Sequence, residues 1–481
     1  MTENPTDKPI RVAVIGSGPA GFYAAGHLLK ESGGRLEVDM LERLPTPWGL
    51  VRSGVAPDHP KIKSVTRVYE KTAAHPRFRY FGNVTFGEHV GHEDLLAHYH
   101  AIVYATGSPS DRPLGIPGEE LPGSHAATDF VGWYNGHPDQ CDLEIDLLSA
   151  ERAVVIGNGN VAIDVARMLV LAAAELAPTD TADHALEVLA ASRVREVVIA
   201  GRRGPAQAAF TNPELLELGE LSEADVIVDA AELERALAVP DPDAEANIPS
   251  RRNVEILRDY ASRTPKGHAK RIVLRFLVSP TELLANPQGR LGSVELVHNE
   301  LVPDDGRLRA QATGERETID AGLVFRAIGY RGIPLPGVPF DERRGVIPNE
   351  AGRIVDLQTR EPVPGEYVVG WIKRGPSGVI GTNKKDAQET VDAMLADLLA
   401  SGGPAVHEPN EPDAAAVESL LRERQPELVT YAGWSEIDRH ERALGEPAGR
   451  PRVKLTRIEE MLRVAASQSP SEESLEEVQA G

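Results

Sequence analysis

Two glycine-rich turns, each set between an apolar strand-like run and a helical pattern, limit what this chain can fold into. The first turn is Gly16-Ser17-Gly18-Pro19-Ala20-Gly21, and the second is Gly157-Asn158-Gly159-Asn160-Val161-Ala162. A strand, such a turn and a helix open a dinucleotide-binding βαβ unit. The pattern recurs after 141 residues. Two complete units at this spacing predict a duplicated α/β architecture rather than one doubly wound sheet.

The first turn has the chemistry of a pyrophosphate site. Gly16 permits the tight turn, Gly18 lets the backbone approach a phosphate, and Gly21 allows close helix–strand packing. The helix that follows offers free N–H groups and a partial positive charge. The next predicted strand, 36–41, ends at Glu42. A carboxylate there binds both ribose hydroxyls and disfavours a 2′-phosphate, so this site predicts FAD or NAD.

The second turn differs at the ribose position. The strand predicted at 197–200 runs into Gly201-Arg202-Arg203-Gly204, where two guanidiniums replace the carboxylate. Arginine binds phosphate bidentately and keeps its charge at all physiological pH values. Arg202 and Arg203 therefore predict NADP(H), although paired arginines also occur as plain surface charges.

Composition excludes several classes of function. The net charge of −22 argues against nucleic acid as the main partner. No run approaches the roughly 18 apolar residues that span a bilayer, and the N-terminus lacks the features of a signal peptide. We therefore expect a cytoplasmic protein without a membrane span. The single cysteine, Cys141, excludes a CxxC dithiol and an iron–sulfur cluster held by this chain's own cysteines.

The remaining segments suggest how the chain is organised. Links between domains are expected near 105–107 and 327–330, because both follow β-branched runs and look alike. Residues 236–250 are rich in Pro, Asp and Ala and predict a loop. Surface helices are expected at 413–424 and 456–464. Residues 465–481 carry acidic but no basic side chains and predict a frayed tail.

Long stretches of the sequence resemble the adrenodoxin-reductase-like ferredoxin–NADP reductases, and most closely their bacterial, actinobacterial-type members. The resemblance is nearly end to end, and it is carried by residues 45–60, 157–167, 201–210, 370–376 and 381–385. It implies two Rossmann-like dinucleotide-binding domains, with the NADP domain inserted into a split FAD domain.

The domain ranges follow from the two expected links, and the activity follows from the resemblance. The FAD domain would comprise 1–108 and 333–481, the latter with C-terminal helices and the acidic tail, and the NADP domain would comprise 109–332. The implied activity is that of a ferredoxin–NADP(+) reductase, which carries hydride from NADPH to FAD and then single electrons to a ferredoxin.

The resemblance also implies the cofactor-binding residues. For FAD, together with Gly16, Gly18 and Gly21 of the first turn, they are Ala20, Glu42, Leu50, Val84, Trp371, Gly378, Val379 and Ile380. For NADP they are Asn158, Gly159, Asn160, Val161, Arg202, Arg203, Glu214 and Gly378. The segment 378–383 is expected to lead into a helix that starts near Lys384, whose N-terminus suits an electron-rich flavin edge.

His59 and Glu214 are the catalytic candidates, because the family places matching residues near flavin and nicotinamide. Hydride passes directly between the cofactors, so we expect orientation and electrostatics rather than acid–base catalysis. A loop-structuring hydrogen bond is the alternative role for His59, and a first-turn helix carboxylate is the alternative for Glu214. Asp164 is not included among the catalytic candidates.

A small acidic iron–sulfur protein would need a locally basic surface on this acidic chain. Residues 247–275 hold eight basic against two acidic side chains. They predict a docking surface at Arg251, Arg252, Lys266, Lys270 and Arg271, unless the segment is only a solvated run of charges.

Two other functions stay open. One is a flavin monooxygenase, whose FxGxxxH fingerprint Phe130-Val131-Gly132 matches except that His137 comes one residue late. The other is a FAD-binding redox sensor without turnover.

Overall fold

The computed structural model describes residues 9–304, 307–399 and 407–468. The chain divides into two compact units. Unit 1 contains the described residues of Met1–Val55, His59–Ser110 and Tyr330–Gly481, and unit 2 contains Ala56–Asp58 and Asp111–Gly329. The chain passes from unit 1 to unit 2 within β5 (Ser110–Asp111) and returns at β15 (Tyr330–Arg331). These two strands form a two-stranded sheet, and residues 111–329 between them are the main part of unit 2. The cofactor assigned to each predicted domain stays a prediction.

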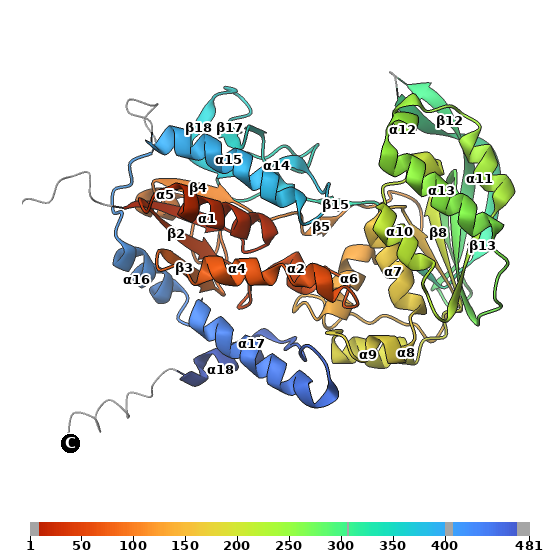
Figure 1. Ribbon diagram of the computed structural model, residues 1–481, viewed down its shortest axis with the longest axis horizontal. Coiled ribbons are helices and arrows are strands. Elements are labelled where there is room, and N and C mark those ends of the chain that lie inside the picture. Colours follow the sequence, from red (N-terminus) through yellow and green to blue (C-terminus); the bar gives the residue numbers. More distant parts are fainter. Residues whose placement is uncertain (1–8, 305–306, 400–406, 469–481) are drawn as a thin grey trace, which may run out of the picture. The chain divides into compact units, whose positions relative to one another are not determined.

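Unit 1 is built on an eight-stranded sheet (Figure 1). In spatial order its strands are β16 (Asn349–Glu350), β17 (Arg353–Val355), β18 (Pro362–Val368), β4 (Ala101–Tyr104), β1 (Ile10–Ile15), β2 (Leu36–Leu41), β3 (Phe78–Gly82) and β19 (Val429–Thr430). Strands β18, β4, β1, β2 and β3 are parallel, and β16, β17 and β19 add antiparallel edges. The order β3-β2-β1-β4 is that of a dinucleotide-binding half-sheet.

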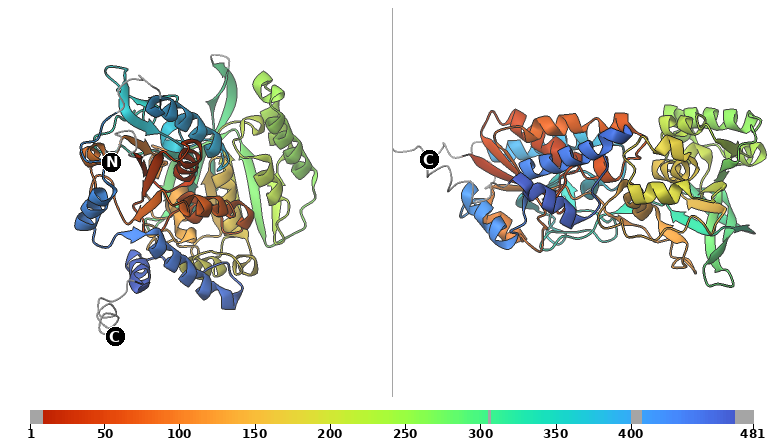
Figure 2. Two further views of the ribbon diagram at one scale, coloured as in Figure 1. Left: turned by 60° about the vertical axis from the view of Figure 1, so that its left-hand side comes forward. Right: turned by 90° about the horizontal axis from the view of Figure 1, so that it is seen from below.

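Both faces of this sheet are buried, which explains the nearly continuous apolar run in β1. Val12 and Val14 point to one hydrophobic core, and Ala13 and Ile15 point to another. Helices α1, α4, α15 and α17 contribute to the first core, and α5 and α16 contribute to the second. Helices α1 and α15 lie side by side (Figures 1 and 2). The helices of unit 1 are α1 (Pro19–Glu31), α2 (Leu50–Ser53), α3 (Pro60–Lys63), α4 (Thr66–Ala73), α5 (His92–His98), α14 (Trp371–Arg374), α15 (Thr382–Leu399), α16 (Ala414–Arg424), α17 (Tyr431–Gly445) and α18 (Ile458–Ala465).

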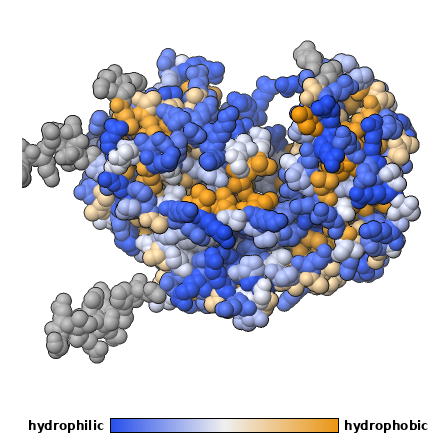
Figure 3. Space-filling model, in the orientation of Figure 1, coloured by the Kyte–Doolittle hydropathy of each residue, from blue (hydrophilic) through white to orange (hydrophobic). Residues whose placement is uncertain are grey.

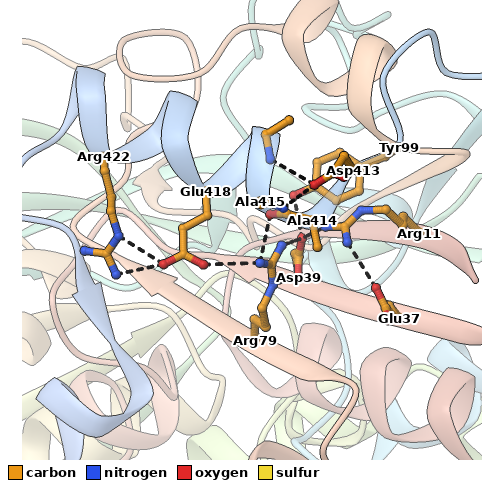
Figure 4. A network of polar contacts seen from close by, with 11 residues as sticks. Arg11, Glu37, Asp39, Arg79, Tyr99, Asp413, Ala414, Ala415, Glu418 and Arg422 are labelled. Carbon is orange, nitrogen blue, oxygen red and sulfur yellow. Dashed lines mark hydrogen bonds and ion pairs between the residues drawn. The ribbon is translucent and has the colours of Figure 1, made fainter.

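A network of charged side chains ties α16 to the sheet (Figure 4). Asp39, on β2, accepts a hydrogen bond from Arg11, two from Arg79 at 2.7 and 2.8 Å, and one from the Tyr99 hydroxyl at 2.8 Å. Arg79 also donates to the carbonyl of Ala414 at 3.0 Å. Arg11 and Asp39 are each only 2% exposed, so their charges are compensated almost entirely by one another and by these neighbours.

Unit 2 contains a six-stranded parallel sheet and a three-stranded antiparallel sheet. The parallel sheet has the order β6 (Ser124–Ala126), β14 (Leu323–Arg326), β7 (Arg152–Ile156), β8 (Glu196–Gly201), β10 (Lys270–Phe276) and β9 (Ala224–Val228). The antiparallel sheet has the order β11 (Val278–Ala285), β12 (Leu291–Asp304) and β13 (Arg307–Asp320).

The two faces of the parallel sheet are covered differently. Val155 and Ile199 belong to a core shared with helices, whereas Val154 and Val198 pack with residues of β11 and β12. The helices of unit 2 are α6 (Ala127–Asn135), α7 (Asn160–Val170), α8 (Ala173–Leu176), α9 (Asp183–Ala190), α10 (Asn212–Leu218), α11 (Ala230–Leu237), α12 (Pro242–Ala246) and α13 (Ile248–Ser262). The prediction of two Rossmann-like α/β units is confirmed.

Some predicted elements differ from the structure. The loop predicted at 236–250 is wrong in part, because it contains α12 and the start of α13. Their N-cap side chains, Asp241 and Asn247, accept backbone N–H groups, and a proline lies in each first turn. Helix α15 starts at Thr382, two residues before the predicted position. Most of the predicted tail lies outside the described residues.

The surface of the chain is largely hydrophilic on the face that Figure 3 shows. Within the described ranges, no helix is long and apolar enough to cross a membrane.

Candidate functional site

The first glycine turn connects β1 to α1 in a form that only glycine allows. Gly16 has φ +105°, and a Cβ there would lie 2.7 Å from the Ala105 carbonyl oxygen. A Cβ on Gly21 would lie 2.1 Å from the Gly16 carbonyl oxygen. A Cβ on Gly18 would meet nothing within 4 Å, so this backbone is open to a ligand. The helix starts at Pro19, and its first N–H groups are available to an anion.

Glu42 lies directly after β2 and is turned toward this glycine turn. Its Oε2 accepts the Ser17 backbone N–H at 2.9 Å and the Ser17 hydroxyl at 2.6 Å, and its Oε1 accepts the Leu44 N–H at 3.1 Å. A carboxylate offers about four lone-pair sites. At least one acceptor position therefore stays available for a ribose hydroxyl.

Two other segments come close to the same turn. A Cβ on Gly49 would lie 2.9 Å from the Gly18 Cα, and a Cβ on Gly370 would lie 2.6 Å from the Ala20 Cβ. Leu50 follows Gly49 at the start of α2 and is 37% exposed. The chain segments 48–50 and 370–371 therefore border the first glycine turn.

The other predicted FAD residues of unit 1 have different environments. Val84 is buried, and its backbone N–H donates to the Glu42 carbonyl at 2.9 Å. Val84 therefore helps to hold the backbone of Glu42, the predicted ribose-binding residue. Trp371 packs against Tyr330 with ring centroids 5.2 Å apart, and its indole N–H donates to the Ser377 carbonyl at 3.2 Å. Gly378 has φ +82°, and Val379 is 53% exposed ahead of α15.

A buried polar atom beside this turn fits a polar ligand. Among the described residues, the hydroxyl of Thr106 is buried without a hydrogen-bond partner. Thr106 is adjacent to Gly16. Because a buried donor without a partner is costly, a dinucleotide with its phosphate, ribityl and ribose oxygens suits this place.

The second glycine turn repeats the geometry in unit 2. Gly157 has φ +133°, and a Cβ there would lie 2.2 Å from the Ala327 carbonyl oxygen, whereas the position of a Cβ on Gly159 is open. Helix α7 starts at Asn160, which is followed by Val161 in its first turn. Asn160 Oδ1 accepts the Thr211 N–H at 2.8 Å, so the turn is tied to the segment that leads into α10.

Asn158 contributes to the same connection. Its carbonyl accepts the N–H groups of Ala209 and Phe210 at 2.9 and 3.1 Å. Its side-chain amide nitrogen is buried and has no hydrogen-bond partner among the described residues. A nucleotide bound at the second glycine turn could accept a hydrogen bond from this amide.

Arg202 and Arg203 follow the end of β8 at Gly201. Within the described part of the chain, neither guanidinium forms an ion pair with a carboxylate. Burial, and next the neighbouring charge of Arg202, lower the pKa of Arg203, while Asp241 acts in the opposite direction. Two adjacent cations with little compensation form an environment that favours an anion such as a 2′-phosphate.

The catalytic candidates lie in different units. His59 belongs to unit 1, is 8% exposed and occupies the N-cap position of α3. Glu214 belongs to unit 2 and lies in the first turn of α10. Gly378, expected at both cofactors, belongs to unit 1.

Asp164, which the sequence made a weaker candidate outside the catalytic set, is a neighbour of Glu214. Its side chain, on α7, is 14% exposed. Burial, and next the negative charge of Glu214, raise the pKa of Asp164 well above its ordinary value. A raised pKa beside a predicted site residue makes Asp164 a candidate for the same site. Its position one helical turn beyond Asn160 was the available sequence signal.

The basic segment predicted to dock a partner is largely compensated by acidic side chains. Arg252 pairs with Glu255, and Arg271 pairs with Glu196. Arg258, Arg263 and Arg275 also form ion pairs with carboxylates. Lys270 donates to the carbonyls of Val170 and Leu171 at 3.2 and 3.5 Å. Among the described residues, Arg251, Lys266 and Lys270 are the basic members of this segment without an ion pair, and Lys270 bonds to carbonyls instead.

The segment that resembled a monooxygenase fingerprint lies in α6 and in the core of unit 2. Phe130 is 0% exposed and packs on Trp133 and Phe325, with ring centroids 5.5 and 4.6 Å away. A Cβ on Gly132 would lie 2.8 Å from the Gln140 side chain. Core packing accounts for these residues.

Two dinucleotide-binding turns on two α/β units define a pyridine-nucleotide-dependent oxidoreductase. Residues 10–200 match the family described as "Pyridine nucleotide-disulphide oxidoreductase". "NADPH-ferredoxin reductase FprA" of Mycobacterium tuberculosis is 54% identical over 464 residues, which cover 95% of this chain and 99% of that protein. "NADPH:adrenodoxin oxidoreductase, mitochondrial" of Salvelinus fontinalis is 42% identical over 474 residues, which cover 96% of this chain and 92% of that protein.

A solved structure shows the same similarity. M. tuberculosis FprA in complex with NADPH matches with a TM-score of 0.90 and 54% identity, and the match covers 96% of this chain and 100% of that one. The chain therefore belongs to the adrenodoxin-reductase-like family of ferredoxin–NADP reductases, as its sequence motifs predicted.

Proposed function

We propose that this chain is an NADPH-dependent flavoprotein reductase whose electron acceptor is a ferredoxin-type iron–sulfur protein. One observation carries the proposal, namely two glycine turns with opposite charges at their ribose positions. Glu42 suits a free ribose diol, and Arg202 and Arg203 suit a 2′-phosphate. One chain thus offers separate places for FAD and NADPH. The relatives named NADPH-ferredoxin reductase and NADPH:adrenodoxin oxidoreductase support the acceptor class.

The proposed cofactor sites follow from the two units. In unit 1, FAD would be held by Gly16, Gly18, Ala20, Gly21, Glu42, Leu50, Val84, Trp371 and the segment Gly378 to Ile380. In unit 2, NADP would be held by Asn158, Gly159, Asn160, Val161, Arg202, Arg203 and Glu214. The open backbone at Gly18 and Gly159 supports both assignments, because a phosphate can approach there without meeting a side chain.

When bound, FAD accepts hydride from NADPH and releases electrons singly to an iron–sulfur cluster. The chain itself binds and orients the reactants. The N-termini of α1 and α7 offer free N–H groups that would bind the pyrophosphates, and Glu42 and the arginine pair would hold the ribose ends. Orientation and electrostatics of this kind are what a protein contributes to a direct hydride transfer between cofactors.

Glu214 would act beside the nicotinamide with Asp164 as its support. Because the pKa of Asp164 is raised well above its ordinary value, this carboxyl group keeps its proton where exposed carboxyl groups have lost theirs. The side-chain oxygens of Glu214 can accept a hydrogen bond from an amide such as that of nicotinamide. In unit 1, His59 would lie near the flavin, where the family places a matching residue.

The acceptor would dock on a basic surface, for which the chain offers two candidates. The first comprises Arg251, Arg252, Lys266, Lys270 and Arg271, where most charges are compensated by carboxylates or carbonyls. The second follows α3 and α4, where residues 61–71 contain four basic side chains against one acidic. Exposed Ile62 and Val68 add apolar area on these helices. Within the described residues, Lys61, Arg67 and Lys71 of the second surface form no ion pair with a carboxylate. On the first surface Arg252 and Arg271 are paired, so the second surface is favoured.

A stepwise reduction experiment tests the proposed function. The purified protein should be yellow, with about one FAD per chain that survives gel filtration. Anaerobic NADPH should bleach the flavin absorbance, and a purified [2Fe–2S] ferredoxin added next should show reduction of its cluster. A colourless protein that FAD cannot reconstitute would overturn the proposal. Bleaching without turnover, with ferricyanide as well as with ferredoxin, would indicate a redox sensor instead.

A further inference from the structure

The backbone at Trp48 and Gly49 is held in an unusual conformation. Trp48 has φ +86° and Gly49 has φ +49°. Large aromatic residues rarely adopt positive φ, because their Cβ then crowds the neighbouring carbonyl. Such a conformation persists only where surrounding contacts compensate its cost.

This conformation brings the backbone of the segment onto the first glycine turn. The Trp48 N–H donates to the Ser17 carbonyl at 3.0 Å, and a Cβ on Gly49 would lie 2.9 Å from the Gly18 Cα. No side chain fits between the two segments at that point. The position of Trp48 and Gly49 therefore defines one wall of the proposed FAD site.

Glu441, a buried carboxylate on α17, binds Arg52, which lies three residues after Gly49. Arg52 donates to the two oxygens of Glu441 at 2.8 and 2.5 Å. Glu441 is 0% exposed and also accepts from the Arg452 guanidinium at 3.2 Å and from the Leu455 N–H at 2.9 Å. Burial alone would raise the pKa of Glu441, but Arg52 and then Arg452 keep that pKa below its ordinary value. Glu441 is thus an ionised group with four hydrogen-bond donors around it.

Aromatic contacts extend this attachment to Trp48 itself. Its ring meets Trp434 of α17 edge to face, with centroids 4.9 Å apart and planes at 82°. The guanidinium of Arg452 lies 5.7 Å from the Trp48 ring, and that of Arg52 lies 5.3 Å from the Trp434 ring. Lys454 donates to the Arg52 carbonyl at 3.0 Å. Trp48 and Arg52 are thus both held by residues 434–455.

We propose that Glu441 is a positioning residue that keeps the Trp48–Gly49 backbone against the first glycine turn and thereby sets the affinity of unit 1 for FAD. Glu441 acts through Arg52 and Trp48. The inference rests on the proposed function, since it assigns FAD to unit 1. The ion pair joins residues 389 positions apart, so α17 is part of the cofactor site's framework rather than a peripheral surface helix.

The test compares E441Q with E436Q in the full-length protein. Glutamine keeps the volume of Glu441 but removes the charge that compensates two buried guanidiniums. Glu436 lies on the same helix and pairs with the exposed Arg439. Three quantities are measured: the FAD dissociation constant by quenching of flavin fluorescence, the NADP⁺ dissociation constant, and the thermal midpoint of the apoprotein.

E441Q should weaken FAD binding about 10-fold or more, because breaking a buried ion pair is costly. Its NADP⁺ affinity should stay within about 2-fold of the wild type, and E436Q should leave both affinities unchanged. If FAD affinity is unchanged while the thermal midpoint falls, Glu441 has only a structural role and the proposal is wrong. A parallel loss of NADP⁺ affinity would also contradict it.

A milder variant covers the case in which E441Q does not fold. W434F retains an aromatic ring but reduces the edge contact with Trp48, so FAD affinity should fall by a smaller factor with NADP⁺ affinity unchanged. Unchanged FAD affinity in W434F would then overturn the inference. Failure of the wild-type protein to bind FAD would instead overturn the proposed function, so the two failures are distinguishable.

Discussion

The carboxylate of Glu42 accepts two hydrogen bonds from Ser17, one from its backbone N–H at 2.9 Å and one from its hydroxyl at 2.6 Å. These bonds fix a negative charge beside the first glycine turn before any ligand binds. The same carboxylate can therefore accept ribose hydroxyls without a change of rotamer, and it would repel a 2′-phosphate.

Replacement of Glu42 by Gln should weaken FAD binding. A hydrogen bond to a charged group contributes about 1.5–3 kcal/mol, so the expected loss is on the order of 10- to 100-fold. Flavin fluorescence during titration of the apoprotein measures this loss. E37Q is the matched control, because Glu37 lies on β2, the strand that leads to Glu42, and pairs with Arg11. Equal FAD affinity in E42Q and the wild type would remove Glu42 from the site.

The local parts of this fold could be predicted from sequence. The predicted strand at 36–41 and β2 have the same bounds, and the predicted strands before both glycine turns lie within β1 and β7. Each of these elements depends on neighbours in the chain, namely an apolar run, a glycine turn and a helical pattern. The structure brings Glu42 beside the first turn for the same local reason, because parallel β1 and β2 end at the same edge of the sheet.

Features that depend on distant pairs could not be predicted in this way. Nothing near Trp48 in the sequence indicates a positive φ, because the contacts that compensate it come from Trp434 and Arg452. The basic segment looked uncompensated because partners such as Glu196 lie far from it in the chain. Helix α12, by contrast, carried a local signal, since Asp241-Pro242 is a typical helix start.

Loss of the arginine pair should change the preference for NADPH over NADH. Two charge-assisted phosphate contacts of about 1.5–3 kcal/mol each predict a preference on the order of 100-fold or more. The double variant R202A/R203A should raise KM for NADPH by a similar factor and leave KM for NADH nearly unchanged. Steady-state ferricyanide reduction measures both constants. Equal losses with the two cofactors would mean that these residues do not bind the 2′-phosphate.

The raised pKa of Asp164 predicts how stability depends on pH. Between its unfolded pKa of about 4 and its raised folded pKa, this residue is deprotonated in the unfolded chain but protonated in the folded one. Its contribution to stability is therefore most favourable below its unfolded pKa and falls as the pH rises toward the folded pKa. D164N has no such titration, so its thermal midpoint should rise relative to that of the wild type as the pH increases from about 4 toward the folded pKa of Asp164. The exposed-site variant E220Q should show no such trend. A constant difference at all pH values would show that Asp164 is ionised in the folded protein.

The Asp39 network predicts a large effect on stability. D39A leaves two guanidiniums, those of Arg11 and Arg79, without their shared buried carboxylate, and it should destabilise unit 1 by about 3–5 kcal/mol. E418A removes a partner of Arg79 and Arg422 that is 34% exposed, and it should cost less than about 1 kcal/mol. Urea denaturation of the two variants provides the comparison. Similar losses in both would mean that burial of Asp39 does not decide the energetics of this network.

The last prediction separates the two candidate docking surfaces by charge reversal. Lys61 and Arg67 have no ion pair within the described residues, and neither do Arg251 and Lys266 on the other surface. The variants K61E/R67E and R251E/K266E therefore change the same formal charge without breaking an observed ion pair. If the acceptor docks along α3 and α4, K61E/R67E should slow ferredoxin-dependent reduction of cytochrome c by NADPH about 10-fold, and R251E/K266E should have little effect.

Salt and a small acceptor provide the controls for this comparison. Exposed charges are screened over about 8–10 Å at physiological ionic strength, so added salt should slow the wild-type ferredoxin reaction. K61E/R67E should lose most of that sensitivity. Ferricyanide is small and reacts without binding to a defined surface, so its reduction by NADPH should be nearly the same in both variants and the wild type. A variant that also fails with ferricyanide has lost hydride transfer or flavin access, and it is replaced by the single substitutions K61E and R67E. If instead R251E/K266E slows the ferredoxin reaction and K61E/R67E does not, the acceptor docks on the segment 247–275, because only a charge that faces the partner changes the rate of its encounter.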